Sequence, residues 1–552
     1  MELEDKIRKI ALENAVEHNG RAIAHSILGR VLATEPSMRS RIPELHAMID
    51  EIVDDVNLLE PDAQRAELEK LGGPEQKKRE ETKGLPPLKN AEKGVVVRFA
   101  PNPDGAIHLG NARPALLSYA YAQKYNGKFV LRFEDTDPKV KTPEKRFYDW
   151  IREDVKWLGI KWNTEAIQSQ RLRIYYDYAE RLIKMGGAYI CTCPVETWRE
   201  LVKKNWPCSC RSLSLDTQLE RWQDMLKYKF KAGQAVMRIK TDLAHPNPAI
   251  RDWPAMRIVD KPVHPLVHKM HVWPLYNWSA GLDDHLMGVT HVLRGQEHST
   301  NETKQRFVYK YFGWEYPNVI ILGRFSLEGL VLSKSVIRAG IEKGEYSGWD
   351  DPKLGTIRAL KRRGWQAEAL RNMVVEIGPT SSDSTIALEN LAAHNRKIVD
   401  KIANRYFFIA EPVKIKIDKP PVKIAKLKLH PNMPKGWRTL RAGNTLLMEK
   451  RDIDENHGKE VRLIGLYNII LNKDKPCKVT GIENRPIQKL HWLPDKEHMK
   501  VKLITPEREI NGLGERTLSK AKIGSVVQFE RFSFVKIEKK SKTGITAVFG
   551  HK

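Results

Sequence analysis

Two short apolar segments constrain the fold of the central part of the chain. The first, Val95–Phe99, has the sequence VVVRF, and the second, Phe129–Phe133, has the sequence FVLRF. Each is a continuous apolar run of strand length, which is typical of a parallel strand buried on both faces. A loop and a helical pattern from Ala112 to Tyr125 lie between them. This order predicts a βαβ unit at the start of an α/β Rossmann-type, doubly wound domain.

The loop after the first apolar segment is a candidate phosphate site. Residues 98–111 have the sequence RFAPNPDGAIHLGN. This is neither GxGxxG nor a P-loop ending in GK[ST], so a dinucleotide fingerprint and a Walker site are both unsupported. Its prolines restrict the turn, its glycines let the backbone approach a ligand, and the next helix offers free N–H groups to a phosphate. His108 could bind a phosphate oxygen or, alternatively, cap the turn.

The segments on either side of this centre have different patterns. Residues 4–70 carry apolar side chains at helical spacing, which predicts a small helical domain that ends in a linker after Gly72-Gly73-Pro74. Residues 413–417 and 422–429 alternate apolar and basic side chains, which predicts half-buried antiparallel strands with a cationic outer face. Further short strands separated by Gly, Pro and Asn extend this pattern into a β-barrel region.

The distribution of charge indicates a polyanionic partner. The net charge of +25 consists of −5 over residues 1–88, +12 over residues 89–395 and +18 over residues 396–552. A polyanion is the leading class of partner for such a surface, and charge alone does not distinguish nucleic acid from another anionic surface. The alternative is a general lysine excess that serves solubility or thermal stability. The sequence has no apolar run long enough to cross a bilayer and no signal peptide at its start. We therefore expect a cytoplasmic protein without a membrane partner.

Several blocks of the sequence, taken in order, resemble one family. Pro101–Asn111 resembles the HIGH signature of class I aminoacyl-tRNA synthetases of the archaeal and eukaryotic glutamyl and glutaminyl type, and Val331–Ser335 resembles their KMSKS loop. Asn111 stands where the family most often has histidine, and it cannot carry a charge. Other blocks similar to the family's lie at residues 132–137, 245–252, 273–276, 283–294 and 395–406. The likeness is weaker over residues 1–88 and thin beyond residue 440.

The resemblance implies a reaction in two steps. With ATP and Mg²⁺ the amino acid forms an acyl-adenylate, and the terminal ribose of tRNA then attacks it. His108 would contact the ATP phosphates, Lys334 would stabilise their charge as pyrophosphate leaves, and a mobile loop would gate the chemistry. Alternatively, Lys334 is an ordinary surface lysine. The implied ATP-binding residues are Pro101, Asn102, Pro103, Gly105, His108, Gly110, Asn111, Leu332, Ser333, Lys334 and Ser335.

The same resemblance implies the residues that bind the amino acid. Arg98 would bind the substrate carboxylate, Glu134 the α-ammonium, and Tyr276 would line the side-chain pocket. Arg294 stands where glutamate-specific members have arginine and glutamine-specific members have an uncharged side chain. Because a buried arginine facing a neutral amide would lack a counter-charge, Arg294 favours glutamate. The alternative is an internal ion pair between Arg294 and a nearby aspartate at position 283 or 284.

The cysteines suggest a metal site. Cys191 and Cys193 form one CxC pair, and Cys208 and Cys210 form a second. Four thiolates would make a closed, structural zinc site, which some glutamyl enzymes carry in their acceptor-binding insertion. The alternative is four reduced thiols without metal. The remaining cysteine, Cys477, is expected to be a small core residue.

The resemblance thus implies a glutamate–tRNA ligase, which we expect to act as a monomer on L-glutamate and tRNA(Glu). Use of tRNA(Gln) stays open, as do three alternatives: a glutaminyl-tRNA synthetase, an inactive tRNA-binding paralogue and a small-molecule adenylating enzyme. The expected domains are a helical domain and linker (1–88), a catalytic domain (89–350) with an acceptor-binding insertion at about 187–275, a helical connector (351–395) and an antiparallel β-barrel anticodon-binding region (396–552).

Overall fold

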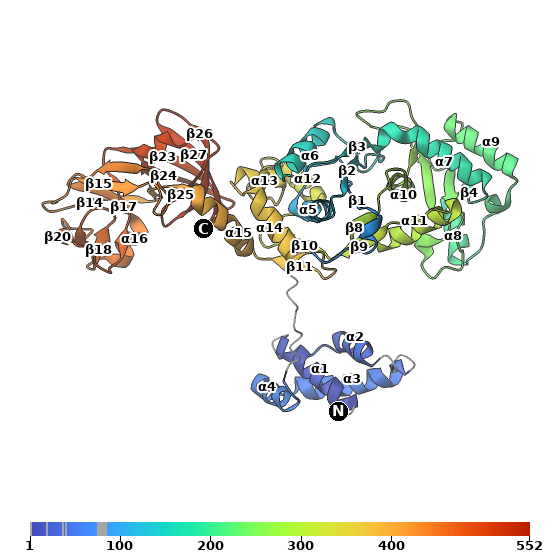
Figure 1. Cartoon of the computed structure of the whole chain (residues 1–552), viewed down its shortest axis with the longest axis horizontal. Coiled ribbons are helices and arrows are strands. Elements are labelled where there is room, and N and C mark those ends of the chain that lie inside the picture. Colours follow the sequence, from blue (N-terminus) through green and yellow to red (C-terminus); the bar gives the residue numbers. More distant parts are fainter. Residues whose placement is uncertain (1–2, 18–19, 36–37, 39–40, 74–84) are drawn as a thin grey trace. The chain divides into compact units, whose positions relative to one another are not determined.

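The computed structural model describes residues 3–17, 20–35, 38, 41–73 and 85–552, in two compact units, 1–82 and 83–552. The described residues of the first unit form the helices α1 Leu3–Glu17, α2 Ala24–Thr34, α3 Ile42–Asn57 and α4 Pro61–Lys70 (Figure 1). Their apolar faces share one core, which confirms the predicted helical domain. The linker predicted after Gly72-Gly73-Pro74 falls largely within residues 75–84, which lie outside the described residues.

A parallel sheet lies at the centre of the second unit. Its strands β1 (Val96–Phe99), β2 (Lys128–Phe133) and β3 (Thr164–Ile167) pair in that order. Strand β8 (His291–Gly295) runs beside β1, where the Thr290 N–H donates to the Val96 carbonyl (2.9 Å), and it pairs in parallel with β9 (Asn318–Leu322). Helices α5 (Leu109–Lys124) and α6 (Lys145–Trp157) share the core of this sheet, which confirms the predicted Rossmann-type fold.

The helix after the phosphate loop begins earlier than predicted. Its first residue is Leu109 rather than Ala112, and His108 is its N-cap. Gly110 and Asn111, both poor helix formers, concealed this start in the sequence. They lie in the first helical turn because the His108 side chain accepts a hydrogen bond from the Asn111 N–H there (3.3 Å).

An insertion and a connector complete the catalytic part. The antiparallel sheet β4 (Ala188–Cys191), β5 (Val236–Ile239), β6 (Pro254–Ile258) and β7 (Val272–Pro274) packs with α7 (Leu172–Lys184) and α9 (Leu215–Leu226), and α8 (Val195–Lys203) lies near Cys191. The chain then returns through α10 (Tyr276–Leu286) and α11 (Ser299–Phe312). The connecting elements are β10 (Phe325–Leu327), α12 (Lys334–Glu342), α13 (Ile357–Arg362), α14 (Ala367–Ile377), β11 (Ser384–Ile386) and α15 (Leu388–Ile402). Helix α15 spans residues 395 and 396, where the connector was expected to end.

Two groups of β-strands follow α15. The first shares one core and holds β14 (Pro412–Lys416), β15 (Ile424–Lys428), β16 (Trp437–Arg441), β17 (Thr445–Glu449), α16 (Lys450–Asn456), β18 (Glu460–Leu463), β19 (Asn468–Ile470), β20 (Lys478–Gly481), β21 (Lys489–Leu490) and β22 (Leu493–Pro494). As predicted, β15 is antiparallel to its neighbour, exposes Lys426 and Lys428 and buries Ala425 and Leu427. The apolar Ile424 lies on the exposed face with the lysines, which the sequence pattern did not predict.

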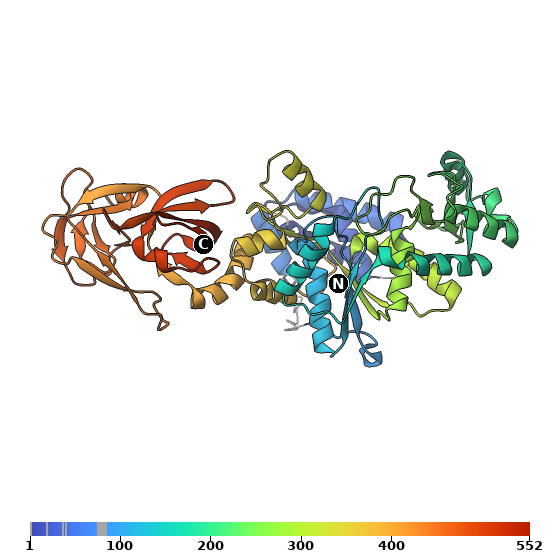
Figure 2. The same ribbon diagram turned by 90° about the horizontal axis from the view of Figure 1, so that it is seen from above.

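The second group forms a nearly closed barrel. Its seven-stranded sheet has the order β12 (Asn404–Tyr406), β25 (Val526–Phe529), β26 (Ser533–Lys540), β27 (Gly544–His551), β23 (His498–Ile504), β24 (Glu509–Glu515) and β13 (Phe408–Ile409). The two outermost strands, β12 and β13, are separated by Phe407 alone, so one stretch of backbone joins both edges of the sheet. The insertion and the strands after α15 extend from opposite sides of the parallel sheet (Figures 1 and 2).

Candidate active site

His108 lies at the carboxyl side of the parallel sheet, where the loop after β1 meets α5. Its Nδ1 accepts the Asn111 N–H, so the capping role considered from the sequence is present. Burial and the nearby charge of Lys334 lower the pKa of His108 to about 4, so the ring is neutral at physiological pH. A neutral imidazole whose Nδ1 accepts a hydrogen bond carries its proton on Nε2. The cap therefore leaves a donor free for a phosphate oxygen.

Lys334 connects the second signature loop to the first. It is the first residue of α12, and its Nζ donates to the Asn102 carbonyl and to Asp104 Oδ1, both at 2.7 Å. Burial lowers the pKa of Lys334, and the Asp104 carboxylate opposes this effect. Ser333 and Ser335 bond to each other through their hydroxyl oxygens at 3.2 Å. Lys334 is thus a half-buried, paired lysine beside His108, and sequence reasoning missed its partner, Asp104.

The rest of the first loop is held in place by its backbone. The carbonyls of Pro101 and Pro103 accept the N–H groups of Glu134 and Glu144, both at 3.0 Å, which ties the loop to the region after β2. The sequence suggested that Gly105 lacks a side chain so that the backbone can approach a ligand. Packing also requires glycine there, because a Cβ at Gly105 would lie 2.5 Å from the Trp349 ring.

Four of the residues predicted to bind ATP have further contacts or unpaired groups in this region. A Cβ at Gly110 would lie 3.1 Å from the His108 ring, so a larger residue there would press on the imidazole. The buried side-chain oxygens of Asn102 and Asn111 have no hydrogen-bond partner within the described residues. Leu332, two residues before Lys334 in the same loop, is partly buried and packs against the main core.

The predicted amino-acid site is a cluster of buried charges. Arg98 Nε donates to Asp284 Oδ1 (2.9 Å), and Arg132 donates to the same oxygen (2.7 Å) and to Glu134 Oε1 (2.9 Å). Sequence reasoning gave no role to Arg132 and considered Asp284 only as a partner of Arg294, although both stand inside blocks that it singled out. The ends of β1, β2 and α10 bring these four side chains together.

Tyr276 lies at the start of α10 against the same cluster. Burial and the negative charge of Glu134 raise the pKa of Tyr276 to about 12, so the side chain is a phenol at neutral pH. Its ring centroid lies 5.6 Å from that of His298, which the sequence did not single out. Arg98 and Arg294 both act electrostatically on Tyr276, so all four predicted residues converge on one place.

Within the described part of the chain, the hydrogen-bond partners of the Arg294 side chain are neutral. Its Nη1 donates to Gln305 Oε1 (3.3 Å) and its Nη2 to the Tyr316 hydroxyl (3.2 Å), while the buried Nε has no partner within the described residues. Burial opposes the charge of Arg294, but Tyr316, Tyr276 and the nearby Asp284 carboxylate together outweigh it and raise the pKa of Arg294. The ion pair considered between Arg294 and an aspartate is absent from the described contacts, since Asp283 pairs with Arg171 and Asp284 with Arg98 and Arg132.

The cluster has an uncompensated positive charge. Three buried guanidinium groups, of Arg98, Arg132 and Arg294, face two carboxylates, of Glu134 and Asp284. A buried charge without a counter-charge is costly, so a ligand of net charge −1 is favoured. Glutamate carries this net charge at neutral pH and glutamine carries none.

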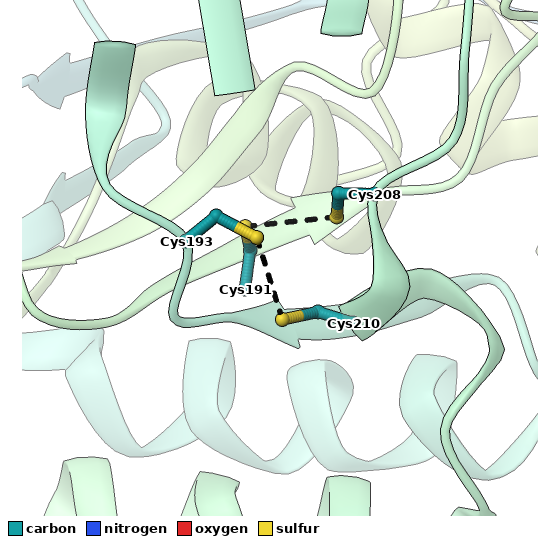
Figure 3. A group of neighbouring side chains, drawn as sticks. All are labelled: Cys191, Cys193, Cys208 and Cys210. Carbon is teal, nitrogen blue, oxygen red and sulfur yellow. Dashed lines mark hydrogen bonds between the residues drawn. The ribbon is translucent and has the colours of Figure 1, made fainter. Parts of the chain in front are cut away.

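The four insertion cysteines form one compact group (Figure 3). Their sulfur atoms all lie within 4.8 Å of one another, with 3.8 Å between Cys191 and Cys208 and 3.7 Å between Cys193 and Cys210. Four sulfurs around a tetrahedral zinc ion are separated by about 3.8 Å. The hydrogen bond between Cys191 and Cys208 raises the pKa of the first and lowers that of the second to about 5. The donor set and its spacing therefore fit zinc.

A basic pocket lies between the two groups of C-terminal strands. It has a volume of about 680 Å³ and lies beside β16 and a short 3₁₀ helix at Arg516–Lys520. Its cationic lining residues are Arg441, Lys496, Arg516 and Lys520.

None of the helices in the described part of the chain has both the length and the apolar character needed to cross a bilayer.

Comparison with known proteins identifies the family. Residues 94–401 match the model of the catalytic domain of class I (E and Q) tRNA synthetases, and residues 403–487 and 489–538 match two models of their anticodon-binding domain. The glutamate–tRNA ligases of Pyrococcus abyssi and Pyrococcus furiosus are 50% and 49% identical to the chain, over 100% of both chains in each case. A crystal structure of a glutamate tRNA ligase from Elizabethkingia meningosepticum is 22% identical and covers 56% of this chain and 71% of that one, with a TM-score of 0.40. The chain therefore belongs to the class I (E and Q) tRNA synthetases.

Proposed function

We propose that the pocket of Arg98, Glu134, Tyr276 and Arg294 binds L-glutamate, which the enzyme ligates to tRNA(Glu) through a glutamyl-adenylate. Arg294 supports this most directly, because it is a buried guanidinium with neutral partners only, in a cluster that has one positive charge in excess. Exchange of labelled pyrophosphate into ATP, driven by glutamate or glutamine in the presence of tRNA, tests the assignment. Glutamate should support exchange, and exchange with glutamine alone would refute it.

Within this proposal each residue has one task. Arg98 pairs with the α-carboxylate, Glu134 with the α-ammonium and Arg294 with the γ-carboxylate, while Tyr276 covers the side chain. ATP binds with Mg²⁺ over the loop of residues 101–111, and the magnesium ion neutralises part of the charge on the phosphates. His108 donates from Nε2 to a phosphate oxygen, and Lys334 exchanges Asp104 for the phosphates.

We propose further that Cys191, Cys193, Cys208 and Cys210 bind one structural zinc ion. Purified enzyme should contain one zinc per chain, and Cys208→Ser should lose it, because a serine hydroxyl is a much poorer zinc ligand than a thiolate. Metal analysis measures both. The matched control is Cys477→Ser, which removes a buried thiol outside the cluster and should keep the metal. Native enzyme free of zinc after purification without chelators would mean four reduced thiols instead.

The basic pocket beside β16 is proposed as part of the surface that binds tRNA. Replacing Arg441 and Arg516 by glutamine should weaken tRNA binding and reduce the slope of log K against log salt by up to about 1.4, if each contacts a phosphate of single-stranded RNA. Binding measured over a range of salt concentrations checks this. Arg21→Gln with Arg65→Gln, two exposed cations of the acidic N-terminal unit, is the control and should leave the slope unchanged. An equal effect of both pairs would refute the assignment.

We also propose a separate role for each region of the chain. Residues 89–350 catalyse the reaction, the insertion at about 187–275 binds the acceptor end, residues 351–395 contact the stem and residues 396–552 bind the anticodon. The acidic helical domain within residues 1–88 lies outside the RNA footprint, since its charge of −5 would repel a polyanion. We further propose that the enzyme acts as a monomer in the cytoplasm, and that charging of tRNA(Gln) with glutamate decides whether it discriminates between the two tRNAs.

A further inference from the structure

We propose that Gln305 is the positioning residue that reserves the charge of Arg294 for the substrate and thereby sets the preference for glutamate over glutamine. This inference rests on the proposed pairing of Arg294 with the substrate side chain. Gln305 lies on α11, is 1% exposed, and packs with its aliphatic part against Gly281 of α10, the helix that begins with Tyr276.

The orientation of the Gln305 amide follows from its neighbours. The Tyr316 hydroxyl donates to Gln305 Oε1 at 2.6 Å, and Arg294 Nη1 donates to the same oxygen at 3.3 Å. Since both neighbours are donors, the oxygen of the amide must face them. The other end, Nε2, is buried without a hydrogen-bond partner among the described residues. The amide therefore holds Arg294 in place as an acceptor.

A neutral acceptor is essential to this arrangement. A glutamate at position 305 has nearly the same shape and could accept the same two hydrogen bonds, but it would form an internal ion pair with Arg294. The positive charge that favours a substrate of net charge −1 would then be cancelled before the substrate arrives. Two buried donors, Arg294 Nε and Gln305 Nε2, have no acceptor in the described structure. A γ-carboxylate offers acceptors only, whereas the amide of glutamine also presents donors.

The test is the ratio of kcat/KM for glutamate to kcat/KM for glutamine in pyrophosphate exchange with tRNA present. Gln305→Glu should lower kcat/KM for glutamate roughly 100-fold, mainly through KM, because the buried ion pair must be broken by each substrate. The KM for ATP should stay unchanged, and kcat/KM for glutamine should change far less, so that the ratio falls. A ratio equal to that of the unmodified enzyme would overturn the inference.

Two further variants separate charge from shape. Gln305→Met keeps the volume and the net charge but removes the acceptor, and should raise the KM for glutamate roughly tenfold while glutamate remains preferred. If the two Gln305 variants lower the ratio equally, or neither changes the KM for glutamate, the charge argument is wrong. Gln123→Glu makes the same chemical change on the exposed side of α5 and should have no effect.

Failure of the inference differs from failure of the proposed function. If Arg294→Met leaves glutamate activation intact, Arg294 does not bind the substrate side chain and both are wrong. If Arg294→Met abolishes the preference for glutamate while both Gln305 variants retain it, the pocket is correctly assigned and only the role of Gln305 is wrong.

Discussion

Lys334→Ala is expected to lower the rate of glutamyl-adenylate formation roughly 100- to 1,000-fold, the usual loss when one group that stabilises transition-state charge is removed from a site that excludes water. Its ammonium already lies beside the loop of residues 101–111, 2.7 Å from the Asn102 carbonyl and from Asp104 Oδ1. ATP phosphates bound at that loop would replace Asp104 as the partner of the Lys334 ammonium. Single-turnover formation of the adenylate measures the step directly.

The same variant should bind tRNA as the unmodified enzyme does, because the basic surfaces of the C-terminal strands are unchanged. Lys343→Ala removes an exposed lysine just after the end of the same helix and provides the control, with no expected effect on adenylate formation. If Lys334→Ala forms the adenylate as fast as Lys343→Ala does, Lys334 does not act on the phosphates.

Arg294→Met should have an effect of similar size on the amino acid. Loss of the guanidinium leaves the γ-carboxylate of glutamate in a buried pocket without a counter-charge, so we expect kcat/KM for glutamate to fall roughly 100- to 1,000-fold through a higher KM. Activation of glutamine should change much less, because a neutral amide does not need that charge. Pyrophosphate exchange with each amino acid gives both numbers.

The variant should still fold, since the neutral partners of Arg294 keep their own hydrogen bond: the Tyr316 hydroxyl donates to Gln305 Oε1. Arg65→Met, on the exposed side of α4, is the control for loss of one arginine. A preference for glutamate that survives Arg294→Met would assign specificity to another residue of the pocket.

The architecture could be predicted from the sequence where a pattern is local. The continuous apolar run at Val95–Phe99 predicts a buried parallel strand, and the alternation of apolar and basic residues predicts the half-buried antiparallel strand β15. The start of α5 could not be predicted in this way, because the cap that extends it to Leu109 is a hydrogen bond that the His108 side chain accepts from the Asn111 N–H, while Gly110 and Asn111 are locally unfavourable in a helix.

The electrostatics of the site could not be predicted, for a different reason. Arg98 and Asp284 are far apart in the sequence, and their ion pair exists only because β1 and α10 meet in the fold. The same holds for Lys334 with Asp104, which are also distant in the sequence. Arg294 and Gln305 are only 11 positions apart, on β8 and α11, but no local pattern pairs them. Sequence reasoning could place the right residue types in one pocket, but only the fold reveals which charges pair with each other and which one is left for the substrate.

The most direct test of the central claim is the charging of purified tRNA(Glu) by the unmodified enzyme, with ATP and either glutamate or glutamine. The product is measured as the labelled amino acid that precipitates with the tRNA in acid, because the ester bond is stable there. We predict that glutamate is esterified to tRNA(Glu) and that glutamine is not. Esterification of glutamine, with glutamate inert, would contradict the assignment of the pocket and of its unbalanced positive charge.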